Sequence, residues 1–330
     1  MGSAPGLGPA PSIQEHQMLR YVGLRLLSTI PVLAFVLLLA FFLLHLAPGD
    51  PAALIAGDSA TPAQVEAIRA QLHLNEPLST QLWIWLIDLA HFDLGRSVFS
   101  NLPVTQLIAQ RFEPTLMLAI STTILAVLLA VPLGVIAAYR ARTGIDRGVI
   151  VLAVAGYSVP VFVIGYCLIF VFAVQLHWLP VQGYKPLAEG LGGTLRSLVL
   201  PTVALALLYV GLIARVTRAT MLEVLDEDYI RTARAKGALT LRVLCIHALK
   251  NAGPPIVTVI GIGFASLIGG VVVTETVFNI PGLGRLTAEA VLRRDYPLVQ
   301  GMLLTFAVML VAINLVVDLT YPLFDPRIRY

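Results

Sequence analysis

Long apolar stretches alternate with polar connections along this 330-residue chain. Six stretches of at least 18 residues contain no Asp, Glu, Lys or Arg. The hydrocarbon core of a bilayer is about 30 Å thick, and a helix needs about 20 apolar residues to cross it. The pattern therefore predicts an all-α polytopic membrane protein with six transmembrane helices. They are expected at about residues 26–47, 114–139, 148–176, 197–214, 252–274 and 297–317.

The third stretch is the longest and has room for more than one helix. His177, Trp178, Pro180 and Gly183 lie near its end, and such residues are typical of a loop. We therefore expect one helix that ends near Leu176, followed by a loop.

The positions of Lys and Arg predict how the chain is oriented, because these residues are retained on the cytoplasmic side. With the N-terminus inside, the inner connections hold 14 of the 22 Lys and Arg residues, and the longer outer connections hold 8. The N-terminus and the C-terminus are therefore predicted to be cytoplasmic. Residues 1–19 are rich in Gly and Pro and are expected to form a disordered tail, and residues 215–251 a cytoplasmic connection.

The connection over residues 50–113 is expected to be an ordered outer cap that contains helices. Thr61 and Pro62 are typical of a helix start, with Pro in the first helical position. A further helix is indicated by an apolar face at helical spacing, made by Leu82, Trp85, Leu86 and Leu89.

The composition excludes several classes of protein. Hydrophobic residues make up 58% of the chain and charged residues 12%, against about 25% charged in soluble domains. The net charge of +3 is small and gives no reason to expect nucleic acid as a partner. The two cysteines, Cys167 and Cys245, are too few for a disulfide-stapled domain and are expected to be free thiols.

The apolar stretches carry no carboxylate, Lys or Arg. Carriers driven by protons or sodium ions usually have such groups inside the membrane, so the energy for transport is expected to come from elsewhere. The sequence also lacks the G-x-x-x-x-G-K-[ST] phosphate loop, the H-E-x-x-H zinc motif and the G-x-S-x-G nucleophile elbow. We therefore predict no catalytic residues, no metal site and no cofactor bound by this chain.

A solute pathway needs polar lining, and small or hydroxyl side chains in the third and fifth stretches are the candidates. They are Ser158, Gly263, Ser266 and Thr274. The same residue types also allow helices to pack closely. Both interpretations remain open from the sequence.

The connection between the fourth and fifth stretches has the pattern of a short capped helix. Asp228 suits the N-cap of a helix from Tyr229, and Gly237 suits the position after its last turn. The helix would have about eight residues and a length of about 12 Å. A second helical stretch over residues 240–251 should end before Gly253-Pro254-Pro255. A solvated basic loop needs none of these features, so we favour a docking element.

This segment resembles the cytoplasmic loop of ABC-importer permeases in the dipeptide/oligopeptide/nickel group, with the form E-A-A-x-x-x-G-x9-I-x-L-P. Ala233, Gly237 and Leu249 fit that form. The departures are Arg231, Thr232, His247 and Lys250. The resemblance assigns the docking of ATPase subunits to Tyr229, Ile230, Arg231, Thr232, Ala233, Arg234, Ala235, Lys236 and Gly237.

Other segments resemble the same family, in the same order, over about residues 19–330. They are the Leu-Ala-Pro-Gly-Asp-Pro run at 46–51, Asp-Leu-Gly-Arg-Ser at 93–97, Phe-Asn-Ile-Pro-Gly-Leu-Gly-Arg at 278–285, Arg-Asp-Tyr-Pro at 294–297 with Gly301, and Asp-Pro-Arg at 325–327. Each segment is a weak signature alone. Their shared order and spacing make the resemblance specific to this group.

The resemblance implies a permease of the type I ABC importer fold over residues 20–330, in a bacterial inner membrane. It further implies a homologous second permease, two ATPase subunits that bind ATP and Mg²⁺, and an extracytoplasmic solute-binding protein. Ala233 would face the ATPase groove. Members of the group carry dipeptides, oligopeptides, nickel chelates, glutathione or glycosides, so the solute stays open. A stand-alone secondary transporter is the alternative, and a membrane-bound enzyme would need a catalytic constellation that is missing.

Overall fold

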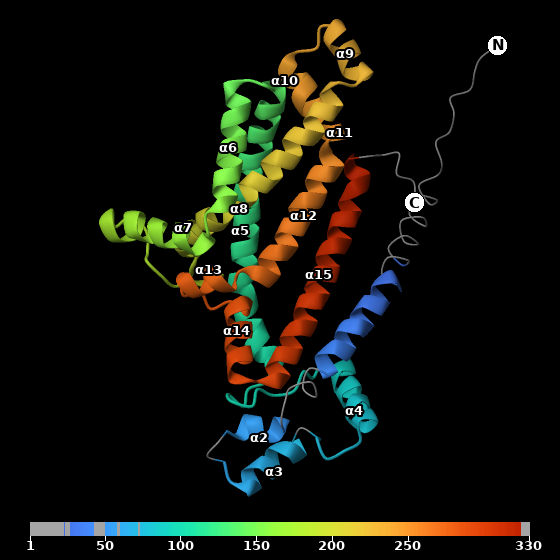
Figure 1. Ribbon diagram of the computed structural model, residues 1–330, viewed down its shortest axis with the longest axis vertical. Helices are drawn as coiled ribbons and strands as arrows, with labels where there is room; N and C mark the ends of the chain where they lie inside the picture. Colours follow the sequence, from blue (N-terminus) through green and yellow to red (C-terminus); the bar gives the residue numbers. More distant parts are fainter. Residues whose placement is uncertain (1–22, 24–26, 43–49, 58–59, 72, 325–330) are drawn as a thin grey trace, which may run out of the picture.

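The computed structural model describes residues 23, 27–42, 50–57, 60–71 and 73–324, and helices account for most of these ranges (Figure 1). The long helices run roughly along the longest axis of the molecule. A short helix, α9 (Asp228–Ala235), lies at one end, which we call the α9 end. The helix α14 (Leu283–Arg293) lies toward the opposite end, which we call the α14 end.

Among the described residues, three helices are long and apolar enough to cross a bilayer without a break. They are α5 (Val104–Tyr139), α8 (Leu191–Leu225) and α15 (Tyr296–Phe324). Each contains one of the predicted spans, over residues 114–139, 197–214 and 297–317. The helices α5 and α8 pack against each other, and small residues allow the contact: a Cβ atom on Gly134 would lie 2.7 Å from the carbonyl oxygen of Ala214.

The third apolar stretch does not form one straight helix. Its helix α6 (Gly144–Ser158) is followed by α7 (Val161–Leu168) and by a π-helical continuation, η1 (Ile169–Gln175), and the chain bends by 95° between α6 and α7. Pro160 explains the bend, because proline has no N–H to donate and forces the residue before it into an extended conformation. The prediction of a single helix over residues 148–176 is therefore wrong at this point.

The fifth apolar stretch follows a second bend. A helical segment made of α10 (Thr240–Arg242), η3 (Val243–Ala248) and α11 (Leu249–Asn251) meets α12 (Gly253–Gly270) at 65°. This confirms the predicted break before Gly253-Pro254-Pro255. A short helix, α13 (Val272–Val277), continues beyond α12.

The described part of the N-terminal region contributes four shorter helices. The predicted first span is described only as the apolar helix Leu27–Phe42. Helices α2 (Pro51–Ala56), α3 (Pro62–Gln71) and α4 (Leu78–Ala90) lie in the predicted cap over residues 50–113. The cap is therefore helical, as expected.

Side-chain contacts hold these helices in place. The backbone N–H of Gln64 donates to the Thr61 hydroxyl (3.4 Å), and the Thr61 N–H donates to the Gln64 side chain (2.8 Å), which closes a capping box at the start of α3. The ring of Trp85 in α4 lies 5.8 Å from that of Phe41. The Gln300 side chain donates to the Ala40 carbonyl (2.9 Å), so the N-terminal helix is anchored to α15.

The largest group of buried side chains joins α5, α8 and α12 to the bent third segment. It includes Leu118 of α5, Leu198 of α8 and Leu267 of α12, each at most 2% exposed. Within a bilayer such helices gain little from leaving water, so close packing is what holds the bundle together.

Candidate functional site

Helix α9 ends as its sequence predicts. Gly237 has φ +80°, and its N–H donates to the Arg234 carbonyl (2.9 Å). The Ala238 N–H donates to the Ala233 carbonyl (3.1 Å). These two bonds form a Schellman motif, which requires a left-handed residue and therefore favours glycine. The predicted position of Gly237 after the last turn of the helix is confirmed.

The start of α9 differs from the prediction by one residue. The helix begins at Asp228, and Glu227 occupies the N-cap with no side-chain capping bond. The Glu227 carbonyl accepts hydrogen bonds from the N–H groups of Ile230 (3.0 Å) and Arg231 (3.3 Å). Asp228 instead forms an exposed ion pair with Arg231 (3.1 Å). Asp228 is therefore an acidic residue in the first turn, which suits the helix dipole, and is not the cap.

The Ile230 side chain fixes α9 to the bundle. Ile230 is completely buried, in a cluster with Met221 of α8 and with Val243 and Leu244 of η3. Four residues at helical spacing on the other side are exposed: Asp228, Arg231, Thr232 and Ala235. Helix α9 therefore has one anchored face and one free face.

The other residues of the segment lie on the sides of α9 between these two faces, or after the end of the helix. Ala233 is half-buried, three residues after Ile230, so it lies beside the anchored face and not at the centre of the free one. Arg234, Lys236 and Gly237 are exposed. Burial raises the pKa of the Tyr229 phenol above its usual value, so this side chain is uncharged at neutral pH.

The four candidate pathway residues do not form one site. Ser158 at the end of α6 and Ser266 in α12 are exposed, and each hydroxyl donates to the carbonyl four residues earlier in its own helix. Gly263 is buried, and a Cβ atom there would lie 3.1 Å from the ring of Tyr209 in α8. Thr274 is 2% exposed in α13. Two of the four residues are thus exposed, and two are buried.

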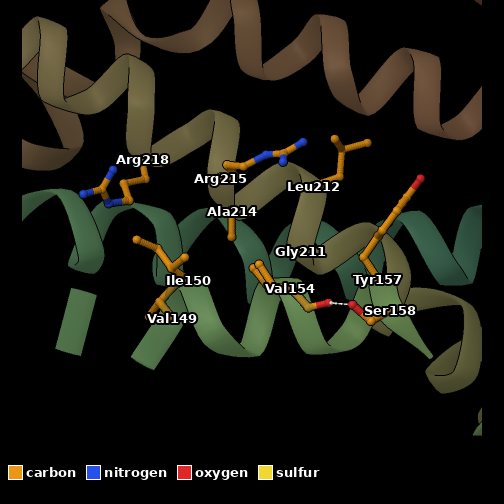
Figure 2. Close-up of a pocket in the computed structure, with 11 residues that line it drawn as sticks. Val149, Ile150, Val154, Tyr157, Ser158, Gly211, Leu212, Ala214, Arg215 and Arg218 are labelled. Atoms are coloured by element: carbon orange, nitrogen blue, oxygen red, sulfur yellow. Dashed lines mark hydrogen bonds between the residues drawn. The ribbon is translucent and has the colours of Figure 1, made fainter. Parts of the chain in front are cut away.

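A groove of about 430 Å³ runs between α6 and α8, and we call it the α6–α8 groove. Figure 2 shows Arg218 at one end, Tyr157 and Ser158 at the other, and Arg215 between them. The walls are apolar and are made by Val149, Ile150, Ala153, Val154, Gly211, Leu212 and Ala214.

A buried ion pair closes the end of the groove nearest α9. Asp146 is 3% exposed and accepts hydrogen bonds from Nε (2.5 Å) and Nη2 (2.8 Å) of Arg218. It also accepts the N–H of Arg142 (2.9 Å). This pair locks the start of α6 onto α8, and sequence reasoning missed it. The positions of the two residues could have indicated it, because Asp146 lies just before the third charge-free stretch and Arg218 just after the fourth.

Buried polar groups also organise the α14 end. The Glu275 carboxyl is completely buried and accepts hydrogen bonds from the Thr115 hydroxyl (2.6 Å) and the Arg285 N–H (2.8 Å). The Thr115 hydroxyl in turn accepts the N–H of Leu283 (2.8 Å). Glu275 therefore caps α14, and a Cβ atom on Gly282 would collide with this carboxyl at 1.9 Å.

Two segments that resemble the permease family meet at the same end. The Ser97 hydroxyl donates to the Asp295 carboxylate (2.5 Å), which also accepts the Val98 N–H (3.3 Å). A Cβ atom on Gly95 would touch Pro297 at 3.8 Å. The 93–97 and 294–297 segments thus form one structural unit.

No group of three or more His, Cys, Asp or Glu side chains in the described residues could hold a metal ion. Cys167 and Cys245 are free and exposed, in agreement with the prediction.

Comparison with known proteins gives two family matches. Residues 130–330 match the family described as binding-protein-dependent transport system inner membrane component. Residues 18–119 match the N-terminal family of the membrane component of the same transport systems.

Similar proteins occur in several bacteria. A probable peptide ABC transporter permease protein of Sinorhizobium fredii (strain NBRC 101917 / NGR234) is 54% identical, over 94% of this chain and 99% of the relative. A putative peptide transport system permease protein of Brucella abortus (strain 2308) is 48% identical, over 93% and 98%. A glutathione transport system permease protein of Escherichia coli (strain K12) is 44% identical, over 95% and 100%.

Among solved structures, the fold is similar to a chain of the MetNI methionine ABC transporter in an inward-facing conformation. The TM-score is 0.55 and the identity 19%, with 67% of this chain and 97% of that chain covered. At this identity the likeness concerns the fold alone.

Proposed function

Because the chain belongs to the family of binding-protein-dependent transport system inner membrane components, we propose that it carries peptides or related small solutes across the membrane in an ATP-driven importer. Two relatives are named for peptides, and the Escherichia coli relative is named for glutathione, which is itself a tripeptide. Family membership contradicts the two alternatives, a stand-alone secondary transporter and a membrane-bound enzyme, since ATPase activity lies in separate subunits.

A component of this kind works with partner ATPases, a binding protein and a second permease. We propose that its partners are a homologous second permease and two ATPase subunits, and that the ATPase subunits bind ATP and Mg²⁺. The solute-binding protein would dock on the outer cap over residues 50–113. The α9 end would be cytoplasmic, with both termini on that side, because the connections there hold most of the Lys and Arg.

The observation that carries the coupling role is the division of α9 into an anchored face and a free face. Ile230 ties the helix to α8 and η3, while Arg231, Thr232 and Ala235 remain exposed to a partner. We assign docking of an ATPase subunit to the segment from Tyr229 to Gly237. Its exposed Arg and Lys side chains favour an acidic edge on the partner's groove.

The contacts of α9 indicate how its displacement would reach the membrane-spanning helices. The helix comes directly after α8 in the chain and packs on η3, which leads through α11 into α12. A displacement of α9 by the ATPase would therefore move both α8 and α12. The ends of these helices would switch access to the pathway between the two sides of the membrane.

The lining of the pathway is assigned to exposed hydroxyls. Ser158 and Ser266 have free surface and offer polar groups without fixed charge. Gly263 and Thr274 would support the lining through packing. Gly263 lets the ring of Tyr209 approach α12, and the side chain of Thr274 in α13 is buried.

Reconstitution tests the function. The permease would be purified with its second permease and ATPase subunits, placed in lipid vesicles, and given the solute-binding protein loaded with peptide. We expect peptide to accumulate only with ATP, and ATP hydrolysis to rise when the loaded binding protein is added. Accumulation driven by a proton or sodium gradient without ATP would contradict the proposal.

A further inference from the structure

We propose that the α6–α8 groove is a subsite for the C-terminal carboxylate of the transported peptide, held by the guanidinium of Arg215. The inference rests on the proposed function, because it takes the solute to be a peptide with a free carboxylate. It goes further by naming the residue that recognises the solute.

Arg215 is a cation without a partner. Among the described residues it takes part in no ion pair or side-chain hydrogen bond, whereas Arg218, one turn further along α8, is held by Asp146. It is exposed and directly follows the charge-free stretch that ends at Ala214. The guanidinium group matches the two oxygens of a carboxylate.

The far end of the groove suits a positive group. Helix α6 stops at Ser158, before Pro160, so its last carbonyls lack partners in their own helix. The C-terminal end of a helix also carries a partial negative charge. The side chains of Tyr157 and Ser158 add hydroxyls at this end. A peptide with an ammonium group at one end and a carboxylate at the other would meet complementary groups at both.

The dimensions of the groove agree with a short peptide. Gly211 of α8 faces Ala153 of α6, and Arg218 faces Asp146, so Arg215 lies near the level of Val149. From there to Ser158 is about 13 Å of helix. Figure 2 shows the Arg215 side chain extending toward the Tyr157 end, which shortens that distance.

Two or three extended residues span about 7–11 Å, which is shorter than the roughly 13 Å of helix between these two levels. The volume of about 430 Å³ falls among those of small-molecule sites, which run from about 300 to 1,000 Å³.

The polar groups at both ends favour a peptide over an anionic phospholipid. A lipid headgroup would satisfy Arg215, but its acyl chains would then lie against the Tyr157 hydroxyl and the C-terminal end of α6. A short peptide avoids this mismatch. The apolar walls between the two ends would accept side chains of many kinds, as a transporter of varied peptides requires.

The test compares peptides that differ only at the C-terminus. The complete importer in vesicles would receive binding protein loaded with a pool of tripeptides, half with free carboxylates and half with C-terminal amides. Mass spectrometry would measure the ratio of acids to amides that accumulate, divided by their ratio on the binding protein. This division removes any selectivity that belongs to the binding protein.

Three variants complete the design. We expect wild-type importer to prefer acids by about tenfold or more, the value of one charge-assisted hydrogen-bonded pair. Arg215→Gln should abolish the preference, and Arg215→Lys should leave about threefold, because Lys keeps the charge but loses the paired geometry. Arg147→Gln, which removes an exposed charge near the start of α6, should behave as wild type. Stimulation of ATP hydrolysis by loaded binding protein checks that each variant is assembled.

The outcomes distinguish failure of the Arg215 subsite from failure of the proposed solute class. A preference that survives in Arg215→Gln would overturn the subsite while leaving peptide import intact. Loss of co-purified anionic phospholipid in Arg215→Gln, with the preference for acids unchanged, would assign the groove to lipid. Failure of the wild-type importer to accumulate any peptide would instead reject the proposed solute class. Should Arg215→Gln not assemble, an unchanged preference in Arg215→Lys would overturn the subsite equally.

Discussion

Gly237 shows how a single backbone conformation defines the proposed docking helix. Its left-handed φ of +80° lets two N–H groups turn back onto the last carbonyls of α9. For a residue with a side chain this conformation costs about 1–2 kcal/mol. No heavy atom lies within 4 Å of the place a Cβ atom would occupy, so the constraint is conformational and not steric.

Replacing Gly237 should therefore impair coupling without affecting assembly of the membrane bundle. We expect Gly237→Glu to lower the population of the intact helix end by about 5–30-fold, as a cost of 1–2 kcal/mol implies. Binding-protein-stimulated ATP hydrolysis should fall accordingly in reconstituted vesicles. Gly237→Ala has a similar backbone cost without an added charge and should impair coupling to a similar extent. A normal Gly237→Ala variant beside a defective Gly237→Glu variant would assign the loss to charge and not to the glycine.

Glu275 is a second residue whose surroundings set its behaviour. It lies just beyond the predicted fifth span, where burial raises the pKa of its carboxyl above the usual value, although hydrogen bonds from Thr115 and Arg285 oppose the shift. A carboxyl with a raised pKa in the folded protein stabilises the fold most when protonated, and this contribution is lost as the pH rises through that pKa.

The direction of the Glu275 pKa shift can be tested by varying the pH. Wild-type complex should gain thermal stability relative to Glu275→Gln as the pH falls from 8 to 5, because only the wild-type side chain can take up a proton. Melting temperatures of the two purified complexes across that range would measure the difference. A difference that shrinks toward acid would mean that the hydrogen bonds outweigh burial and hold the carboxyl ionised.

Among the elements, α9 is attached mainly through Ile230. The completely buried Ile230 packs against Met221 and Val243, which belong to the segments before and after α9. The charged residues of α9 are exposed and form at most a surface ion pair, which contributes little. Attachment of the helix is therefore mainly hydrophobic.

Ile230→Ala should uncouple ATP hydrolysis from transport. Removing a buried Ile side chain costs about 2–5 kcal/mol, which frees α9 from η3 while leaving its exposed docking face unchanged. We expect the ATPase subunits to co-purify as with wild type, and the number of peptides imported per ATP hydrolysed to fall severalfold. Leu239→Ala, at an exposed position just beyond the docking segment, controls for a general effect of changing this connection. An unchanged peptide-to-ATP ratio in Ile230→Ala would argue that α9 moves independently of its anchor.

Predictability from sequence differs between elements. Residues 104–139 and 191–225 are helical as their apolar runs indicate, and the end of α9 at Gly237 follows from local chemistry. The 95° bend at Pro160 was missed, since a proline inside a membrane helix can be absorbed when neighbouring groups satisfy the backbone. The partners of Asp146 and Glu275 lie 72 and 160 residues away along the chain, and such pairing depends on tertiary structure.

At the scale of the whole molecule, charge distribution predicts the direction of insertion. The connection that contains α9 is rich in Lys and Arg, while the region with α2, α3 and α4 is not. These two regions lie at opposite ends of the molecule (Figure 1). A single bilayer between them would place them in different compartments.

Thiol labelling in intact cells tests this orientation. In a variant with Cys167 and Cys245 replaced by Ser, a membrane-impermeant maleimide should label Ser79→Cys in the cap from outside. Leu241→Cys, which is exposed beside α9, should react only after the cells are permeabilised. The reverse pattern would invert the topology and remove α9 from the compartment that contains ATP.

The arrangement around Ile230 has a mechanical consequence. The end of α8, helix α9 and the η3 segment leading to α12 all contribute to one buried cluster around Ile230. A close-packed cluster has low compressibility and transmits strain. A displacement of α9 should therefore reach α8 and η3 together, with little of it absorbed inside the cluster.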